Sequence, residues 1–200
     1  MIYETFQELK LSALGMGCMR LPQGDAYADI NVPEVKRMVA LAMEKGVNYY
    51  DTAWGYHDGN SERVMGEVLS AYPRENFYLA TKFPGYDLSN MGKVKEIFEE
   101  QLERCRVDYF DNYLLHSLGA DSYEKVEQLG GFAFLSRMQA AGKIRRIGFS
   151  YHDGADFLDR VLTEHPEIQL VQLQINYVDW EDPVVQARRC YEVCVKHRRP

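Results

Sequence analysis

Residues 33–51, PEVKRMVALAMEKGVNYYD, contain the change of pattern that decides the fold of this chain. Asn31 is placed to cap a helix that begins at Pro33, and apolar residues at helical spacing give that helix one apolar face before Gly46 ends it. The β-prone run Val47–Asp51 follows at once and ends on a carboxylate. The stretch therefore predicts a helix, a turn and a strand in direct succession.

The same succession recurs along the chain. Apolar residues at helical spacing and β-prone runs predict further helices at 61–69, 94–102, 126–142, 157–162 and 183–198, and strands at 12–17, 77–82, 109–116, 144–150 and 170–177. Strands that alternate with single helices require parallel pairing and right-handed crossovers. Either a (β/α) barrel or a doubly wound sheet satisfies this requirement.

Two features favour the barrel. A doubly wound nucleotide-binding sheet would carry a glycine-rich turn after its first strand, but GMGCMR at 15–20 lacks the third glycine. Polar side chains instead stand at the carboxyl ends of successive strands, where barrel enzymes place their active sites: Asp51, Lys82, His116, Ser150 and Gln174. We therefore predict the α/β class and a (β/α)8 TIM-type barrel, of which about six β/α units are present in this chain.

We expect one domain over residues 1–200, in which residues 1–11 form a β-hairpin ahead of the first barrel strand. The last predicted helix ends near residue 198, where the seventh strand of a complete barrel would follow. A barrel without its last strands leaves unpaired N–H and C=O groups at two edges. We therefore expect self-association through these open sheet edges.

Composition limits the classes of function. The formal charge of −7, with 46% hydrophobic and 26% charged residues, disfavours nucleic acid and membranes as partners and leaves small-molecule chemistry open. The N-terminus does not resemble a leader and no apolar run has membrane-spanning length, so we expect a cytoplasmic protein. The four cysteines form no CxxC pair, so we expect reduced thiols and no bound metal.

Asp51, Tyr56 and Lys82 belong to consecutive strand ends and could meet. A phenol with an ordinary pKa of about 10 is a weak proton donor at neutral pH, and a nearby ammonium lowers that pKa. Lys82 would supply the ammonium, Asp51 would hold it charged, and His116 from the next strand would donate to the same oxygen. Each residue alone has an ordinary structural explanation, but together they describe an acid that protonates an oxygen on which negative charge develops.

Eight segments resemble those of the aldo-keto reductases: Gly15–Gly17, Asp51–Tyr56, Ser61–Glu62 with Gly66, Thr81–Lys82, Leu114–His116, Gly142–Arg145, Ile147–Ser150 and Gln172–Tyr177. The resemblance covers essentially the whole chain, and the combination of DTAxxY with GKIRxIGxS is specific. The segments DTAWGYHDG and GFSYH look closest to a bacterial branch of the family. Relative to that family, the chain is truncated at its C-terminus.

The resemblance implies an oxidoreductase that reduces aldehydes or ketones by hydride transfer from NAD(P)H, with a small-molecule carbonyl substrate. Tyr56 would be the general acid, Lys82 and Asp51 would tune it, and His116 would orient the carbonyl. The implied cofactor is NADP(H) in preference to NAD(H). Its expected contacts are Gly17, Cys18, Met19, Asp51, Ser150, Tyr151 and Gln174.

Three further aromatic residues, Trp54, His57 and Tyr86, are placed to line the substrate pocket. Tyr151 departs from the pattern of many members of the family, which have asparagine after the serine of this strand. The pyrophosphate and the 2′-phosphate are expected to bind to segments of the seventh and eighth strands, which this chain lacks.

Two alternatives come from other classes. A metal-dependent barrel hydrolase would show a cluster of histidine ligands, often HxH after an early strand, but residues 17–19 are Gly-Cys-Met. A catalytically inactive protein on the same scaffold, either a sensor of the nicotinamide cofactor or a fragment, would keep the same four residues. Carbonyl-dependent oxidation of NADPH distinguishes that second alternative from an enzyme.

Overall fold

The sheet order of this protein follows its sequence. The computed structural model describes residues 1–200. Six strands occur in chain order: β3 (Met16–Gly17), β4 (Tyr49–Asp51), β5 (Tyr78–Phe83), β6 (Phe110–Leu118), β7 (Ile144–Tyr151) and β8 (Leu170–Leu173). The pairs β3–β4, β4–β5 and β7–β8 are parallel. The predicted class is confirmed: the fold is α/β, with six strands of a TIM-type barrel.

The chain divides into two units. The first comprises Met1–Phe83 with Lys95–Asn112, and the second comprises Pro84–Val94 with Tyr113–Pro200. The first unit opens with the predicted hairpin, whose strands β1 (Tyr3–Phe6) and β2 (Leu9–Ser12) pair antiparallel. Its other elements are α1 (Val32–Glu44), η1 (Tyr56–Gly59), α2 (Asn60–Leu69), η2 (Arg74–Asn76) and α3 (Val94–Cys105).

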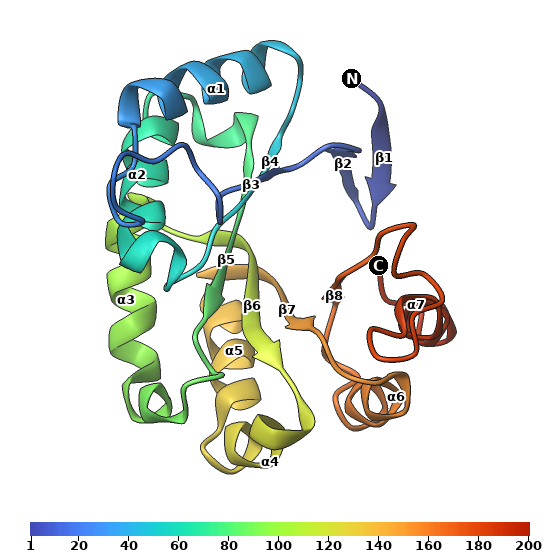
Figure 1. Cartoon of the computed structure of the whole chain (residues 1–200). Helices are drawn as coiled ribbons and strands as arrows, with labels where there is room; N and C mark the ends of the chain where they lie inside the picture. Colours follow the sequence, from blue (N-terminus) through green and yellow to red (C-terminus); the bar gives the residue numbers. More distant parts are fainter. The chain divides into compact units, whose positions relative to one another are not determined.

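Helices α1, α2 and α3 lie on one side of β3, β4 and β5 (Figure 1). Helix α1 begins at Val32, one residue before the predicted start, and has the predicted cap: the Asn31 side chain accepts a hydrogen bond of 3.2 Å from the Glu34 N–H, and a proline stands in the first turn. Val35 and Val39 form the buried face of this helix. The apolar spacing and the cap together fix where the chain turns back toward β4.

The second unit contains η3 (Leu88–Lys93), α4 (Ala120–Gln128), α5 (Gly131–Ala140), α6 (Ala155–Glu164) and α7 (Ala187–Lys196), together with β7 and β8. Helices α6 and α7 lie side by side next to β8 (Figure 1). Ion pairs of 2.8 Å between Arg189 and Asp156 and of 2.7 Å between Lys196 and Asp159 join these two helices. No helix of the protein combines the length and the hydrophobicity that crossing a bilayer requires.

Four predicted elements were wrong in extent. The helix expected over 126–142 is two helices, because Gly130 adopts a φ of 74° between α4 and α5. Helix α7 begins at Ala187 and not at Pro183, because the Asp182 carboxylate accepts the Val184 and Val185 N–H groups in a turn. The first barrel strand is reduced to Met16–Gly17, and the last ends at Leu173, so Gln174 follows the strand.

Gly66 marks the closest contact between α2 and the end of α3. A Cβ atom there would lie 2.2 Å from the Arg104 carbonyl oxygen and 2.7 Å from the Cys105 carbonyl carbon. Both neighbours are backbone atoms, so no side chain can rotate away to make room. The glycine therefore sets the distance between α2 and α3 and, with it, the depth of the side chains that α2 presents to the sheet.

We predict that Gly66→Ala lowers the free energy of unfolding by about 2 kcal/mol or more, because the added methyl forces two packed backbones apart. Urea denaturation followed by circular dichroism measures this change. Gly92→Ala is the matched control, since a Cβ at Gly92 meets nothing within 4 Å. Equal midpoints for the wild type and Gly66→Ala would show that α2 is not held at this distance.

Candidate active site

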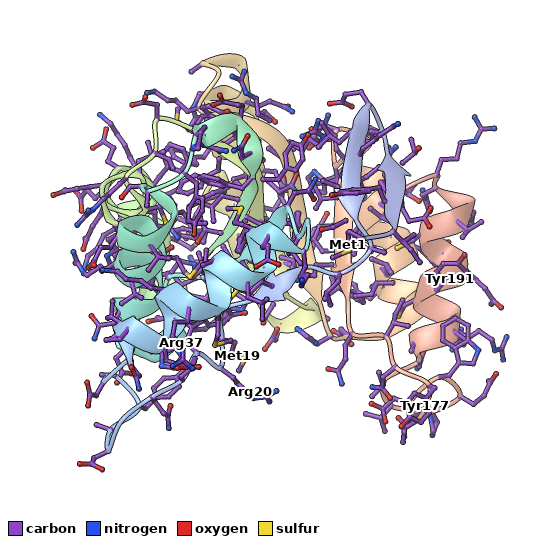
Figure 2. The ribbon with its side chains drawn as sticks, turned by 90° about the horizontal axis from the view of Figure 1, so that it is seen from above. Met1, Met19, Arg20, Arg37, Tyr177 and Tyr191 are labelled. Carbon is purple, nitrogen blue, oxygen red and sulfur yellow. The ribbon has the colours of Figure 1, made fainter.

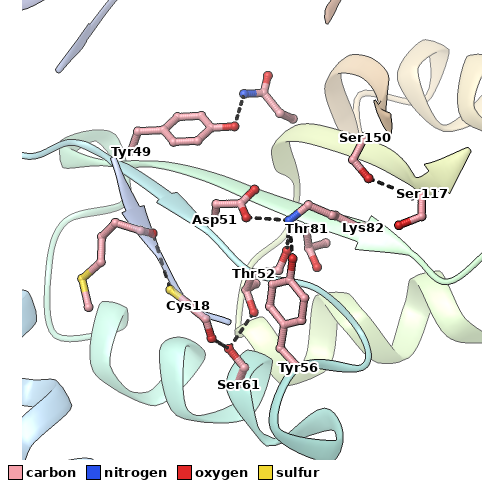
Figure 3. Close-up of polar contacts among 12 residues, drawn as sticks. Cys18, Tyr49, Asp51, Thr52, Tyr56, Ser61, Thr81, Lys82, Ser117 and Ser150 are labelled. Atoms are coloured by element: carbon pink, nitrogen blue, oxygen red, sulfur yellow. Dashed lines mark hydrogen bonds and ion pairs between the residues drawn. The ribbon is translucent and has the colours of Figure 1, made fainter. Parts of the chain in front are cut away.

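The side chain of Lys82 is the centre of a buried polar group at the ends of β4 and β5. Its ammonium Nζ donates to Asp51 Oδ1 at 2.5 Å, to the Thr52 carbonyl at 2.9 Å and to Tyr56 Oη at 3.3 Å (Figure 3). The parallel register pairs Asp51 with Ala80, two residues before Lys82, which brings the carboxylate and the ammonium to the same edge of the sheet. The structure thus brings together Asp51, Tyr56 and Lys82.

These three contacts use all the donors of Lys82. An ammonium has three N–H groups and no acceptor, and each group here points at an oxygen. Only 2% of the Lys82 side chain is exposed, so water cannot replace any of these partners. The charge is therefore held in one orientation, with the Tyr56 hydroxyl as one of its three fixed neighbours.

The pKa of Tyr56 is raised above its ordinary value, mainly because burial disfavours the phenolate. Lys82 acts in the opposite direction and lowers this pKa, as expected, whereas the Asp51 carboxylate raises it. The expected net lowering is therefore wrong in this structure, because desolvation outweighs the ammonium. Tyr56 is protonated at neutral pH and can donate a proton.

A second chain of hydrogen bonds fixes the backbone around Asp51. Ser61 Oγ donates to the Cys18 carbonyl at 2.9 Å, so the Thr52 hydroxyl, 2.9 Å from Ser61 Oγ, is the donor of that pair (Figure 3). The Cys18 N–H donates to the Asp51 carbonyl at 2.8 Å. The ends of β3 and β4 and the beginning of α2 are thereby joined.

The three expected cofactor contacts after β3 differ in exposure. The Cys18 thiol is fully buried and donates to the Met16 carbonyl, and burial raises its pKa. Its side chain is therefore part of the core and offers nothing to a ligand. Gly17 has open space at its Cα, and Met19 points away from the ribbon, as does its neighbour Arg20 (Figure 2).

His57 does not line a pocket, so its expected role is wrong. The side chain is fully buried and its ring stacks on Tyr27 with centroids 4.6 Å apart. The Leu21 N–H donates to Nε2 at 3.0 Å, so Nδ1 carries the proton and donates to the Tyr27 carbonyl at 2.6 Å. His57 and Asp58 have positive φ values of 51° and 54°, which turn the histidine inward.

The other aromatic candidates remain partly open to solvent. Trp54 is half-buried, and the Arg104 guanidinium lies 3.7 Å from the centroid of its ring. In the second unit, Tyr86 is half exposed and packs edge-on against His116 with centroids 5.2 Å apart. Tyr86 and His116 are therefore neighbours, as two residues of one pocket would be.

Ser150 and Tyr151 face opposite sides of β7, as neighbouring residues of a strand must. Ser150 Oγ accepts the Ser117 N–H at 2.7 Å (Figure 3). The Tyr151 hydroxyl donates to the Gly154 carbonyl at 2.6 Å, and this buried ring borders a small cavity together with Ala187 and Cys190 of α7. Gln174 lines the same cavity, and the expected cofactor contact of the Tyr151 side chain stays a prediction.

Comparison with known proteins agrees with this geometry. The family model of the aldo/keto reductases matches residues 13–198. The chain belongs to the aldo/keto reductase family. It is 32% identical to methylglyoxal reductase YeaE of Escherichia coli over 151 residues, which cover 74% of this chain and 49% of that protein.

Two other relatives complete the comparison. An NADH-specific methylglyoxal reductase of Escherichia coli is 27% identical over 195 residues, which cover 86% of this chain and 57% of the relative. The crystal structure of an aldo-keto reductase from Klebsiella pneumoniae in complex with NADPH superposes with a TM-score of 0.72 at 23% identity, over 100% of this chain and 66% of that one. The chain spans about half the length of the curated relatives it matches.

Two side chains at the ends of β7 and β8 could hold the carboxamide of a nicotinamide. Ser150 Oγ accepts one hydrogen bond and keeps its own proton for another acceptor. Ser150 pairs in register with Gln172, and Gln174, two residues later, is exposed. A hydroxyl donor and a side-chain amide thus stand at the ends of neighbouring strands, which fits the donors and acceptors of a carboxamide. The structure contains no group of His, Cys, Asp or Glu side chains arranged to hold a metal ion.

Three buried polar residues of this chain were not predicted as parts of the site: Glu62, Thr81 and Gln101. The sequence contains a signal for two of them. Glu62 precedes the buried Met65, Gly66 and Leu69 by three, four and seven residues, and Gln101 shares the spacing of the buried Ile97 and Cys105. A charged or amide side chain on the apolar face of a helix indicates a buried polar contact.

We predict that His57→Ala lowers the free energy of unfolding by about 2 kcal/mol or more, because it leaves the Leu21 N–H and the Tyr27 carbonyl without their partner. Chemical denaturation measures the change. His152→Ala, at an exposed histidine, is the control and should leave stability nearly unchanged. A stable His57→Ala variant with an altered KM would restore the pocket role.

We also predict that Lys82→Met raises the pKa of Tyr56 further, by about one unit or more, because the ammonium that favours the phenolate is lost while burial remains. Fluorine NMR of protein that contains 3-fluorotyrosine follows the titration of Tyr56. The ring fluorine lowers the phenol pKa and so brings the titration to a lower pH. The signal of Tyr56 is the one that is missing in Tyr56→Phe. Lys36→Met, which breaks an exposed ion pair with Glu67, is the control. An unchanged Tyr56 pKa in Lys82→Met would contradict the coupling.

Proposed function

We propose that this chain carries the proton-donating site of an NAD(P)H-dependent reductase of aldehydes and ketones, with Tyr56 as the general acid. One observation carries the proposal: Tyr56 Oη lies 3.3 Å from an ammonium that is itself locked onto Asp51 and the Thr52 carbonyl in a buried position. A phenol in such a contact stays protonated at rest, and the phenolate it becomes is stabilised at once.

The proposed step transfers one proton from Tyr56 Oη to the carbonyl oxygen of the substrate. When bound, NAD(P)H would supply a hydride to the carbonyl carbon, and negative charge would then develop on the carbonyl oxygen. That oxygen takes the proton from Tyr56 Oη, and the resulting phenolate faces the Lys82 ammonium. Burial strengthens this attraction because water does not screen it. Solvent then returns a proton to Tyr56, and the balance is one hydride and one proton added to the carbonyl group.

Other residues of the proposed site hold the reactants. His116, which packs against Tyr86, is proposed as a second donor to the carbonyl oxygen. Tyr86 and Trp54 are proposed as walls of the substrate pocket. Ser150 and Gln174 are proposed to hold the nicotinamide carboxamide, and Asp51 to approach the cofactor ribose. Gly17 and Met19, at and after the end of the first barrel strand, are proposed as contacts of the cofactor.

The substrate class we propose is a small carbonyl compound. Two relatives of this chain are methylglyoxal reductases, which supports a dicarbonyl such as methylglyoxal as the first substrate to assay. NADP(H) is the proposed cofactor. Because one of these relatives is NADH-specific, each assay includes NADPH and NADH in parallel.

We predict that Tyr56→Phe reduces carbonyl-dependent oxidation of NADPH by ~10² to 10⁴, because it removes the proton donor and nothing else. Steady-state absorbance of NADPH measures the rate, and urea denaturation checks that the fold is retained. Tyr177→Phe removes a hydroxyl from a side chain that is 94% exposed and should leave the rate unchanged. A Tyr56→Phe variant with more than about a tenth of wild-type turnover would exclude Tyr56 as the acid.

A further inference from the structure

Glu62 is a fully buried carboxylate near the candidate acid, with donors from two other elements. Its Oε1 accepts the Thr81 hydroxyl of β5 at 2.6 Å and Gln101 Nε2 of α3 at 2.6 Å. Its Oε2 accepts Arg104 Nη1 at 3.2 Å. Removing a carboxylate from water costs several kcal/mol. Burial accordingly raises the pKa of Glu62, and the hydrogen bonds from Thr81, Gln101 and Arg104 oppose that rise by stabilising the charged form.

One branch leads to the backbone of Lys82. Gln101 Nε2, which Glu62 binds, also lies 3.1 Å from the Lys82 carbonyl and 3.2 Å from the Thr81 hydroxyl. Thr81 and Gln101 thus hold the chain on both sides of the Lys82 Cα, and both depend on the same carboxylate oxygen. The position from which the Lys82 side chain extends is set by this network.

The other branch leads to the loop that carries Tyr56. Arg104 donates to Glu62 and places its guanidinium 3.7 Å from the centroid of the Trp54 ring. Trp54 stands between Asp51 and Tyr56 in the sequence. Ser61, the residue before Glu62, bonds to the Thr52 hydroxyl and the Cys18 carbonyl. Two consecutive residues of α2 therefore hold the end of β4, the end of β5 and the loop between Asp51 and Tyr56.

We propose that Glu62 is a positioning residue for the contact between Tyr56 and Lys82. Its charge holds Thr81 and Gln101 against the backbone of Lys82 and holds Arg104 under Trp54, so it fixes both partners of the contact. This inference rests on the proposed function only in its consequence for catalysis. The positioning itself is measured on the protein without substrate or cofactor.

The distance dependence of charge interactions makes the effect measurable. The Lys82 ammonium favours the Tyr56 phenolate from 3.3 Å. At an effective dielectric constant of about 20, a lengthening by about 1 Å weakens that interaction by the equivalent of roughly 0.9 pKa unit. A loss of positioning therefore raises the Tyr56 pKa. Direct removal of a negative charge acts in the opposite direction, because an anion nearby disfavours the phenolate.

Glu62→Gln is the test variant, because it keeps the shape of the side chain and removes its charge. A glutamine amide has one acceptor oxygen, so it cannot accept from Thr81 and Gln101 on one side and Arg104 on the other. We expect the Tyr56 pKa, followed by fluorine NMR of protein containing 3-fluorotyrosine, to rise by about half a unit to one unit. An unchanged or lowered pKa would overturn the proposal.

Glu100→Gln is the matched control. Glu100 makes the other ion pair of Arg104, at 2.8 Å, and has the same charge, but its contacts do not include Thr81 or Gln101. We expect the pKa of Tyr56 in this variant to equal that of the wild type. An equal rise in both variants would assign the effect to the charge around Arg104 and would overturn the positioning role of Glu62.

A second variant covers the case in which Glu62→Gln does not fold. Thr81→Val removes one hydroxyl of the network, without a change in charge and with little change in shape, and is expected to raise the Tyr56 pKa by a smaller amount in the same direction. Urea denaturation establishes that each variant is folded, and a folded Thr81→Val variant with a wild-type pKa would contradict the inference.

Kinetics separate this inference from the proposed function. If Tyr56 is the acid, the alkaline limb of the pH profile of kcat/KM moves in Glu62→Gln by the amount that NMR measures for Tyr56. If NMR shows the rise and the kinetic profile does not move, the positioning role stands and the acid role of Tyr56 fails. If neither the Tyr56 pKa nor the kinetic profile changes in Glu62→Gln, and the wild type is active, the positioning role fails.

Discussion

The burial of the Lys82 ammonium is the constraint on which the rest of the site depends. A charge that is almost completely removed from water must meet an oxygen at each of its three donors, and the fold provides these oxygens from the end of β4 and the loop after it. The parallel register of β4 and β5 brings the carboxylate to the ammonium, and the turn at η1 returns the Tyr56 hydroxyl to the same point. Helix α2 then secures both strand ends through Ser61 and Glu62.

The alternation of helix and strand could be predicted because it depends on the spacing of apolar residues, which the sequence displays directly. The limits of elements could not be predicted where a single backbone angle decides them. Nothing in the apolar spacing of residues 120–140 distinguishes one helix from two, and the break follows from the left-handed conformation of Gly130. Likewise, the start of α7 follows from the turn that the Asp182 side chain stabilises, which competes with a helix that Pro183 could also begin.

The candidate site, too, could be predicted from the sequence only in part. Asp51, Tyr56 and Lys82 could be placed together because the carboxyl ends of parallel strands converge, a property of the fold and not of any side chain. His57 was misplaced because it is adjacent in sequence to Tyr56 but points the other way, through two consecutive left-handed residues. Glu62 and Gln101 stand on apolar faces of helices, so the pattern that identified those helices also contained the exception that marks the network.

Burial and the Lys82 ammonium shift the pKa of Tyr56 in opposite directions. Burial nevertheless helps Tyr56 in two ways: it keeps the phenol protonated at rest, and it strengthens the attraction that stabilises the phenolate. Because burial dominates in the resting protein, the phenol keeps its proton at neutral pH. Because burial also reduces screening, the attraction between Lys82 and a newly formed phenolate is stronger than it would be in water. A longer contact between Tyr56 and Lys82 would weaken the attraction that supports the phenolate, so this contact must not lengthen. A rigid support is therefore required behind both residues, and a buried, fully partnered carboxylate such as Glu62 supplies rigidity that an apolar contact, which has no preferred direction, would not.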